Sequence, residues 1–286
     1  MTKEVSMKNK FLTIILAVLF FSSGYGLNEC LASDAKSQGG ADLRAQVQNP
    51  VSAMYSLPFK FMFDYGAPDG DASILNIQPV IPVTKDDWNL VSRVIIPLIH
   101  LTGPVSGTPE IPNPTPGDGA TGLGDINYSL FFSPVKYKKW IWGIGPSISL
   151  PTATSNQLGS GKWSAGPTAV VLTQPKPWSL GVLVRQIWSF AGKSDRPDVN
   201  QFLIEPFVNY NLKGGWYLIT DMIITANWDA PSSQRWTVPL GGGVGKLFNI
   251  GKQPINVRTE AYYNVEKPDA GPEWQWGFTV QFLFPR

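Results

Sequence analysis

The chain has 286 residues, of which 43% are hydrophobic and 15% are charged, and its formal net charge at pH 7 is +2. A charge so close to zero predicts no nucleic-acid partner. Beyond residue 32, no apolar run reaches the length of about 20 residues that a transmembrane helix needs. The composition therefore argues against a nucleic-acid-binding protein and against a helical membrane protein.

The N-terminus carries the signs of an export signal. Residues 11–21 are almost all apolar, and Lys8 and Lys10 precede them. The run is too short to cross a bilayer as a helix, but it fits the core of a signal peptide. We expect a signal peptide at residues 1–32, cleaved after Ala32, and hence an exported protein.

Cys30 is the only cysteine of the sequence and leaves one alternative open. With Leu27 three residues before it, the site resembles a lipoprotein anchor, but the bulky, charged Glu29 argues against lipidation. Cleavage after Ala32 leaves 286 − 32 = 254 residues without a cysteine. An exported chain without disulfides needs another source of stability, which a closed, hydrogen-bonded β-barrel supplies.

Residues 33–56 are polar and lack the alternation of a β-strand. Within them, residues 41–47 could form one or two helical turns. We expect an N-terminal segment that lies in the periplasm or plugs the mouth of a barrel, and disorder is the alternative.

From residue 57 onward, apolar and polar residues alternate in twelve stretches. In the last stretch Trp274, Trp276 and Phe278 share one face, while Gln275 and Thr279 share the other. Because strand side chains point to opposite faces with period two, each stretch has an apolar and a polar face. The predicted strands are 57–65, 72–81, 88–99, 123–132, 140–150, 162–173, 178–190, 201–212, 216–228, 235–248, 253–265 and 274–284. They predict an all-β fold, an antiparallel up-and-down transmembrane β-barrel of about 12 strands at residues 57–286.

The connections alternate between short and mostly longer ones, which is typical of periplasmic turns and extracellular loops. The longest, residues 100–122, could fold into the lumen or bind a partner outside. Prolines inside the strands fit less well, because proline donates no ladder hydrogen bond. We therefore expect bulges or a locally opened seam near Pro79, Pro97, Pro146, Pro167, Pro206 and Pro239.

The charged residues of the strands fall on the faces opposite the aromatic residues. A charge facing lipid at mid-depth costs about 2–4 kcal/mol, so these residues should line the lumen. The candidates are Lys60, Asp64, Arg93, Asp125, Arg185, Glu205, Asp221, Arg258 and Glu260. A soluble β-sandwich would show the same parity, but tryptophans at the ends of the apolar faces favour a membrane girdle. The girdle candidates are Trp178, Trp188, Trp216, Trp228, Trp274 and Trp276.

Several motifs occur along nearly the whole mature chain. They include Leu75-Asn76-Ile77-Gln78-Pro79, Trp140-Ile141-Trp142-Gly143-Ile144-Gly145-Pro146, Leu158-Gly159-Ser160-Gly161-Lys162-Trp163 and Gly166-Pro167-Thr168. In these motifs the chain resembles the outer-membrane transporter family linked to the meta-pathway of phenol degradation. The resemblance implies a barrel and a role in uptake, without an agreed substrate and without catalytic residues.

We expect a bacterial outer-membrane channel that passes small, aromatic or amphipathic molecules by diffusion through a mixed-charge lumen. Its expected partners are membrane lipid, the solute and the barrel-assembly machinery, with no cofactor and no metal; the oligomeric state stays open. One alternative is a structural or adhesive barrel with a plugged lumen. Another is an outer-membrane hydrolase, for which the single histidine, His100, is the one candidate base.

Overall fold

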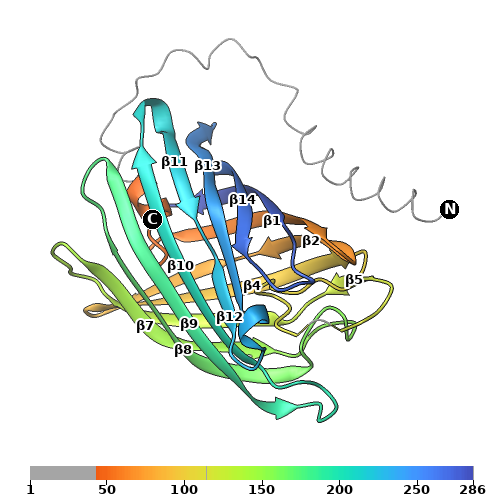
Figure 1. The fold of residues 1–286 in the computed structure, drawn as a ribbon. Helices are drawn as coiled ribbons and strands as arrows, with labels where there is room; N and C mark the ends of the chain where they lie inside the picture. Colours follow the sequence, from red (N-terminus) through yellow and green to blue (C-terminus); the bar gives the residue numbers. More distant parts are fainter. Residues whose placement is uncertain (1–42, 114, 286) are drawn as a thin grey trace. The chain divides into compact units, whose positions relative to one another are not determined.

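One antiparallel sheet of 15 strands makes up most of the described part of the chain (Figure 1). The computed structural model describes residues 43–113 and 115–285. The expected signal peptide and residues 33–42 lie outside the described residues. The chain divides after Gly39, and the sheet belongs entirely to the second unit, Gly40–Arg286.

The sheet closes on itself, because β9 pairs with β10 as well as with β8. Three places in the ring are each filled by two short strands in succession, namely β2 with β3, β5 with β6, and β11 with β12. The ring therefore has twelve places, and the predicted 12-stranded antiparallel barrel is confirmed. The strands are β1 (Tyr55–Ala67), β2 (Gly70–Ile77), β3 (Val80–Lys85), β4 (Trp88–Leu101), β5 (Ala120–Leu123), β6 (Ile126–Pro134), β7 (Ile141–Leu150), β8 (Lys162–Thr173), β9 (Trp178–Gly192), β10 (Asn200–Asn211), β11 (Trp216–Asp221), β12 (Ile224–Asn227), β13 (Trp236–Ile250), β14 (Gln253–Glu266) and β15 (Trp274–Phe284).

Each of the three interrupted strands breaks at or opposite a proline. Pro79 lies in the gap between β2 and β3, and its carbonyl accepts a hydrogen bond from the Val94 amide at 3.1 Å. Gly124, between β5 and β6, donates to the carbonyl of Pro97 at 2.8 Å. Because proline cannot donate to a neighbouring strand, the ladder is interrupted there while its carbonyl still holds the two strands together.

The remaining irregularities of the strands also lie at or opposite prolines. The gap between β11 and β12 faces Pro206, whose carbonyl accepts from the Met222 amide at 3.3 Å. At Val238 and Pro239 the pairing of β13 with β14 shifts register, as in a β-bulge. Pro146 and Pro167 face each other between β7 and β8. The sheet thus accommodates its prolines by breaks and a bulge while every place in the ring stays paired to both neighbours.

The alternation of short and longer connections has one exception. Only Pro68 and Asp69 separate β1 from β2, so the connection expected at residues 66–71 is a tight turn. Strand ends also differ from the prediction by a few residues, and β3 continues to Lys85. Such ends depend on local pairing, which alternation alone does not define.

The outer surface of the sheet is apolar and aromatic. The six tryptophans predicted for the girdle have exposed fractions between 38% and 53%. Neighbouring strands bring aromatic rings together, as for Phe63 and Trp276 with centroids 5.2 Å apart and for Trp178 and Tyr210 at 4.7 Å. An exposed apolar face of this size is stable in contact with lipid.

Candidate functional site: the lumen and its two covers

The long connection after β4 folds into the barrel. We call residues 102–113 the lumen loop. Val105 and Ile111 are fully buried and pack with Ile99, Leu101 and Leu158. Burial of these two apolar side chains anchors the loop inside the barrel rather than in solvent.

The lumen loop reaches opposite sides of the barrel wall. Asn76 on β2 donates to the Glu110 carboxylate at 2.6 Å, and Gln201 on β10 donates to the Pro109 carbonyl at 3.3 Å. Six steps around the twelve-place ring separate β2 from β10, so these strands oppose each other. The loop therefore crosses the lumen.

Two further loops at this end are held to Thr115, which follows the lumen loop in the chain. The buried Arg196 guanidinium donates to the carbonyls of Gly159 at 2.7 Å and Asn156 at 2.9 Å, and also to the hydroxyl of Thr115. The connections after β4, β7 and β9 are thereby held together. In the last of them, hydrogen bonds from Lys162 and Ser189 lower the pKa of Asp198.

The opposite end of the barrel is covered by residues 43–54, which we call the mouth segment. Residues 43–47 form a short helix, within the stretch where helical turns are expected. The Gln48 side chain accepts from Ser179 on β9 at 2.8 Å and donates to Asn211 on β10 at 3.0 Å. Val51 packs among buried residues of β4, β6, β7 and β8. The segment thus reaches from one side of the wall to the other.

Arg44 fixes the mouth segment to the turn that follows β10. Its guanidinium donates to the carbonyls of Leu212 at 2.7 Å and Trp216 at 3.2 Å. Partial burial lowers the pKa of Arg44. Met54 packs with Leu247 and Leu283, which attaches the other end of the segment.

Two cavities lie between these covers. The first, which we call the loop-side cavity, measures about 920 Å³ including its open part and is lined in part by Pro109, Glu110 and Pro112 of the lumen loop. The second, the mouth-side cavity, measures about 830 Å³ and is lined in part by Val47, Gln48 and Pro50.

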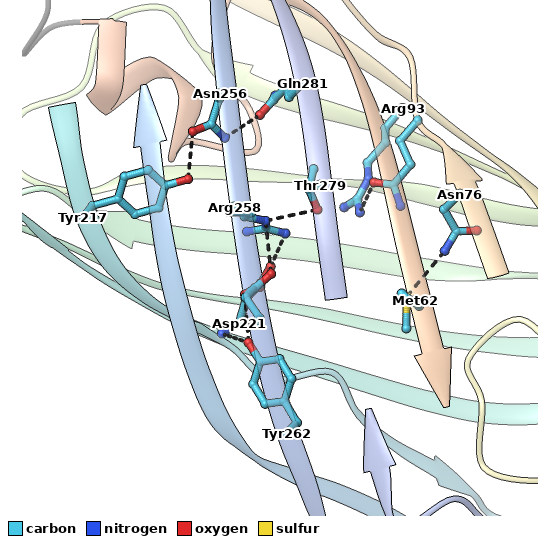
Figure 2. Close-up of polar contacts among 12 residues, drawn as sticks. Met62, Asn76, Arg93, Tyr217, Asp221, Asn256, Arg258, Tyr262, Thr279 and Gln281 are labelled. Atoms are coloured by element: carbon cyan, nitrogen blue, oxygen red, sulfur yellow. Dashed lines mark hydrogen bonds and ion pairs between the residues drawn. The ribbon is translucent and has the colours of Figure 1, made fainter. Parts of the chain in front are cut away.

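The two cavities share four lining residues, Lys60, Gln78, Arg93 and Glu205. We call these four residues the waist. Arg93 donates to the Gln78 side-chain oxygen at 3.3 Å (Figure 2). The lumen is therefore a pair of chambers in series that meet at a charged waist.

A paired charge network lies beside the mouth-side cavity. The Arg258 guanidinium contacts Asp221 at 2.8 Å and Glu260 at 3.2 Å. Tyr262 donates to Glu260 at 2.9 Å and its hydroxyl accepts from the Asp221 amide at 2.9 Å. Figure 2 shows Arg258 held between Asp221 and Thr279. Every charge in this network has a partner, so the network is a structural element of the wall.

The remaining predicted lumen residues have different surroundings. Arg185 lines the loop-side cavity and donates to Gln201 at 3.1 Å. Asp125 also lines that cavity, but it accepts hydrogen bonds from the Ser160 amide and hydroxyl at 2.7 and 2.8 Å, which fixes the loop that contains Ser160. Asp64 is fully buried, has no hydrogen-bond partner on either oxygen, and lines neither cavity.

Glu110 is the main lining residue that the sequence does not single out. It lies in a loop, where period-two alternation gives no information about the direction of a side chain. Its contact with Asn76 becomes visible only once the loop is placed in the lumen.

His100, the candidate base of a hydrolase, lies beside a threonine. His100 contacts the hydroxyl of Thr121 through Nδ1 at 2.6 Å, near the surface, and no serine takes that place. Within residues 43–113 and 115–285, no group of three or more His, Cys, Asp and Glu side chains could hold a metal ion. No helix of this part of the chain is long and apolar enough to cross a membrane.

The fold has solved counterparts among outer-membrane proteins. The COG4313 outer membrane channel from Pseudomonas putida F1 superposes with a TM-score of 0.57 at 14% identity, over 81% of this chain and 96% of the other. The toluene transporter TodX of Pseudomonas putida matches over 84% and 92% at 9% identity, with a TM-score of 0.41. The outer membrane phospholipase A of Escherichia coli matches over 86% and 98% at 13% identity, with a TM-score of 0.43. No curated protein matches the chain in sequence.

The closed ring of strands, its apolar outer face and its polar interior define an outer-membrane β-barrel. Residues 69–286 match the family described as "Putative MetA-pathway of phenol degradation". This match covers more than half of the chain, so the protein belongs to that family, and the resemblance drawn from its motifs is confirmed.

Proposed function

We propose that the protein is an outer-membrane channel through which small amphipathic molecules diffuse. The observation that carries this proposal is the pair of cavities in series inside a closed barrel. A barrel that served only as a structural element would need no such connected space in its interior. The family's description, with its link to phenol degradation, supports a small aromatic solute.

In this proposal the two covers correspond to an occluded state of the channel. Solute would enter past the lumen loop, cross the waist and leave past the mouth segment. Loops and terminal segments are the parts of a barrel that move most readily, since few ladder hydrogen bonds hold them. Residues 33–56 would then be a plug, residues 1–32 a cleaved signal peptide, and residues 57–286 the barrel inserted by the assembly machinery.

Two features of the interior support passage of a solute with both polar and apolar parts. The loop-side cavity is lined by charged and hydroxyl side chains, and also by Ile95, Phe131 and Leu183. Opposed acidic and basic side chains orient polar groups, while apolar patches accept hydrocarbon. The lumen-lining candidates would act together in this way, with Lys60, Arg93, Arg185 and Glu205 nearest the path.

The test is single-channel recording of the refolded mature protein in a planar bilayer. We expect discrete conductance steps that become shorter or less frequent when phenol is added. A barrel that folds, as judged by the gel mobility of unheated samples, yet gives no steps would favour a plugged structural barrel instead. Turnover of a phospholipid that depends on His100 would favour the hydrolase.

A further inference from the structure

Three cations of the loop-side cavity lack acidic partners. The four ion pairs found among residues 43–113 and 115–285 involve Lys136, Lys162 and Arg258 as cations. None of them includes Lys60, Arg93 or Arg185, which all line the cavity. None of these three cations therefore has a carboxylate of this part of the chain within ion-pair distance.

The hydrogen bonds of these cations are also incomplete. Arg185 is 9% exposed, its Nη2 donates to Gln201, and its buried Nε has no partner. Arg93 donates to Gln78 alone, at 3.3 Å. A guanidinium has five N–H donors in a planar fork that matches a carboxylate. Both guanidinium groups thus keep donors available to a ligand.

The charges act on the same space. Glu110 and Glu205 attract Arg185 while Arg93 repels it, and Lys60 and Arg93 both attract Glu205. Mutually repelling, partly desolvated cations are costly unless an anion sits between them. Glu110, Asp125 and Glu205 line the same cavity, but none of them forms an ion pair with Lys60, Arg93 or Arg185.

An apolar wall borders the same cavity. Phe131, Leu183 and Leu203 belong to a single buried cluster, and Ile223 packs against it. These residues line the cavity together with the cations, as do Ile95 and Ile187. A ligand that satisfies both parts needs an anionic head and a hydrocarbon body of small size.

We propose that the loop-side cavity is a binding station for a small organic carboxylate with an aromatic or hydrocarbon body. The carboxylate lies between Arg185, Arg93 and Lys60, and the body packs on the apolar wall around Phe131. The proposal deepens the proposed channel function by naming its solute class. Glu205 competes with the ligand for Lys60 and Arg93 and so limits how tightly the solute is held, which a passage site requires.

The experiment is calorimetric titration of the refolded mature protein in detergent micelles with three probes. Benzoate carries both features, benzyl alcohol lacks the charge, and acetate lacks the body. We expect benzoate to bind at least about tenfold more tightly than either of the others, as a charge-assisted hydrogen bond or a buried ring each contributes about a factor of ten. Equal affinity for benzoate and benzyl alcohol would overturn the proposal.

Two substitutions should act in opposite directions. Arg185→Gln removes a cation and is expected to weaken benzoate binding about tenfold, while Glu205→Gln removes the competing acid and is expected to strengthen it. Lys252→Gln, in an exposed turn, is the control and should change nothing. If Arg185→Gln does not fold, Lys60→Gln removes another cation of the same cavity and tests the same proposal. Weakening by both variants would show structural damage rather than a charge effect and would overturn the proposal.

Binding and conduction are read separately. If the protein binds benzoate with this preference but gives no conductance steps, the carboxylate site is supported and the channel function is refuted. If it conducts but does not distinguish benzoate from benzyl alcohol, the channel function is supported and the carboxylate site is refuted.

Discussion

Arg258 offers the sharpest test of how the barrel interior is stabilised. Its side chain is 17% exposed, and the Asp221 and Glu260 side chains that it contacts are 8% and 2% exposed. Arg258→Met keeps much of the side-chain length but leaves two buried carboxylates without a counter-ion. Removing one partner of a buried ion pair costs about 3–5 kcal/mol. Because Asp221 and Arg258 border the mouth-side cavity, where water can approach, we expect the lower end of that range.

The matched control removes all three charges together. Arg258→Met combined with Asp221→Asn and Glu260→Gln leaves no uncompensated charge, so its free energy of unfolding should return to within about 1 kcal/mol of the unaltered protein. The assay is urea unfolding of the refolded protein in phospholipid vesicles, with the folded fraction read from the gel mobility of unheated samples. A single variant as stable as the original, or a triple variant no better than the single one, would refute the reasoning.

Three further perturbations test the covers and the buried acid. With Asn76→Cys and Glu110→Cys, a short reducible thiol cross-linker should tie the lumen loop to β2 and make conductance steps rarer, and a reductant should restore them; identical recordings in both states would contradict a moving loop. Deletion of residues 33–54 should enlarge the steps, because the mouth segment no longer covers its end, and unchanged steps would place the constriction elsewhere. Asp64→Leu should raise the free energy of unfolding by about 1–3 kcal/mol, because it removes a polar group that is fully buried without a hydrogen bond; a decrease measured in urea would point to an unseen partner.

The barrel could be predicted from the sequence because the two faces of each strand meet different surroundings. Trp274 and Trp276 alternate with Gln275, and the structure places both tryptophans at the surface. The same alternation repeated in every strand gives the number of places in the ring. Period two is a local property, so no knowledge of the neighbouring strand is needed.

The interruptions of the strands could not be located in the same way. The break at Gly124 lies opposite Pro97, 27 residues earlier in the chain, and the break at Met222 lies opposite Pro206. A proline visible in one strand thus acts on the next strand, at a position set by the pairing register. Alternation within one strand does not contain that register.

The covers of the lumen were beyond prediction for a related reason. Val105 and Ile111 stand among prolines and glycines in a loop without periodicity, and their burial depends on the space that the closed barrel offers. The sequence left the loop free to fold inward or outward. The burial of these two side chains, together with the contacts of Glu110 with Asn76 and of Pro109 with Gln201, decides between these arrangements.

The alternation along the strands predicts that all these charged residues face the lumen. Their ion pairs divide them into two groups with different physical roles. Arg258 is balanced by two acids, whereas Arg185 has a cavity before it and no acid in contact. Stability and binding should therefore separate. Neutralising the Arg258 network as a whole should leave the benzoate preference intact, while Arg185→Gln should change that preference and alter the free energy of unfolding by less than about 1 kcal/mol. If Arg185→Gln destabilised the barrel as strongly as Arg258→Met, Arg185 would belong to the wall and not to the path of the solute.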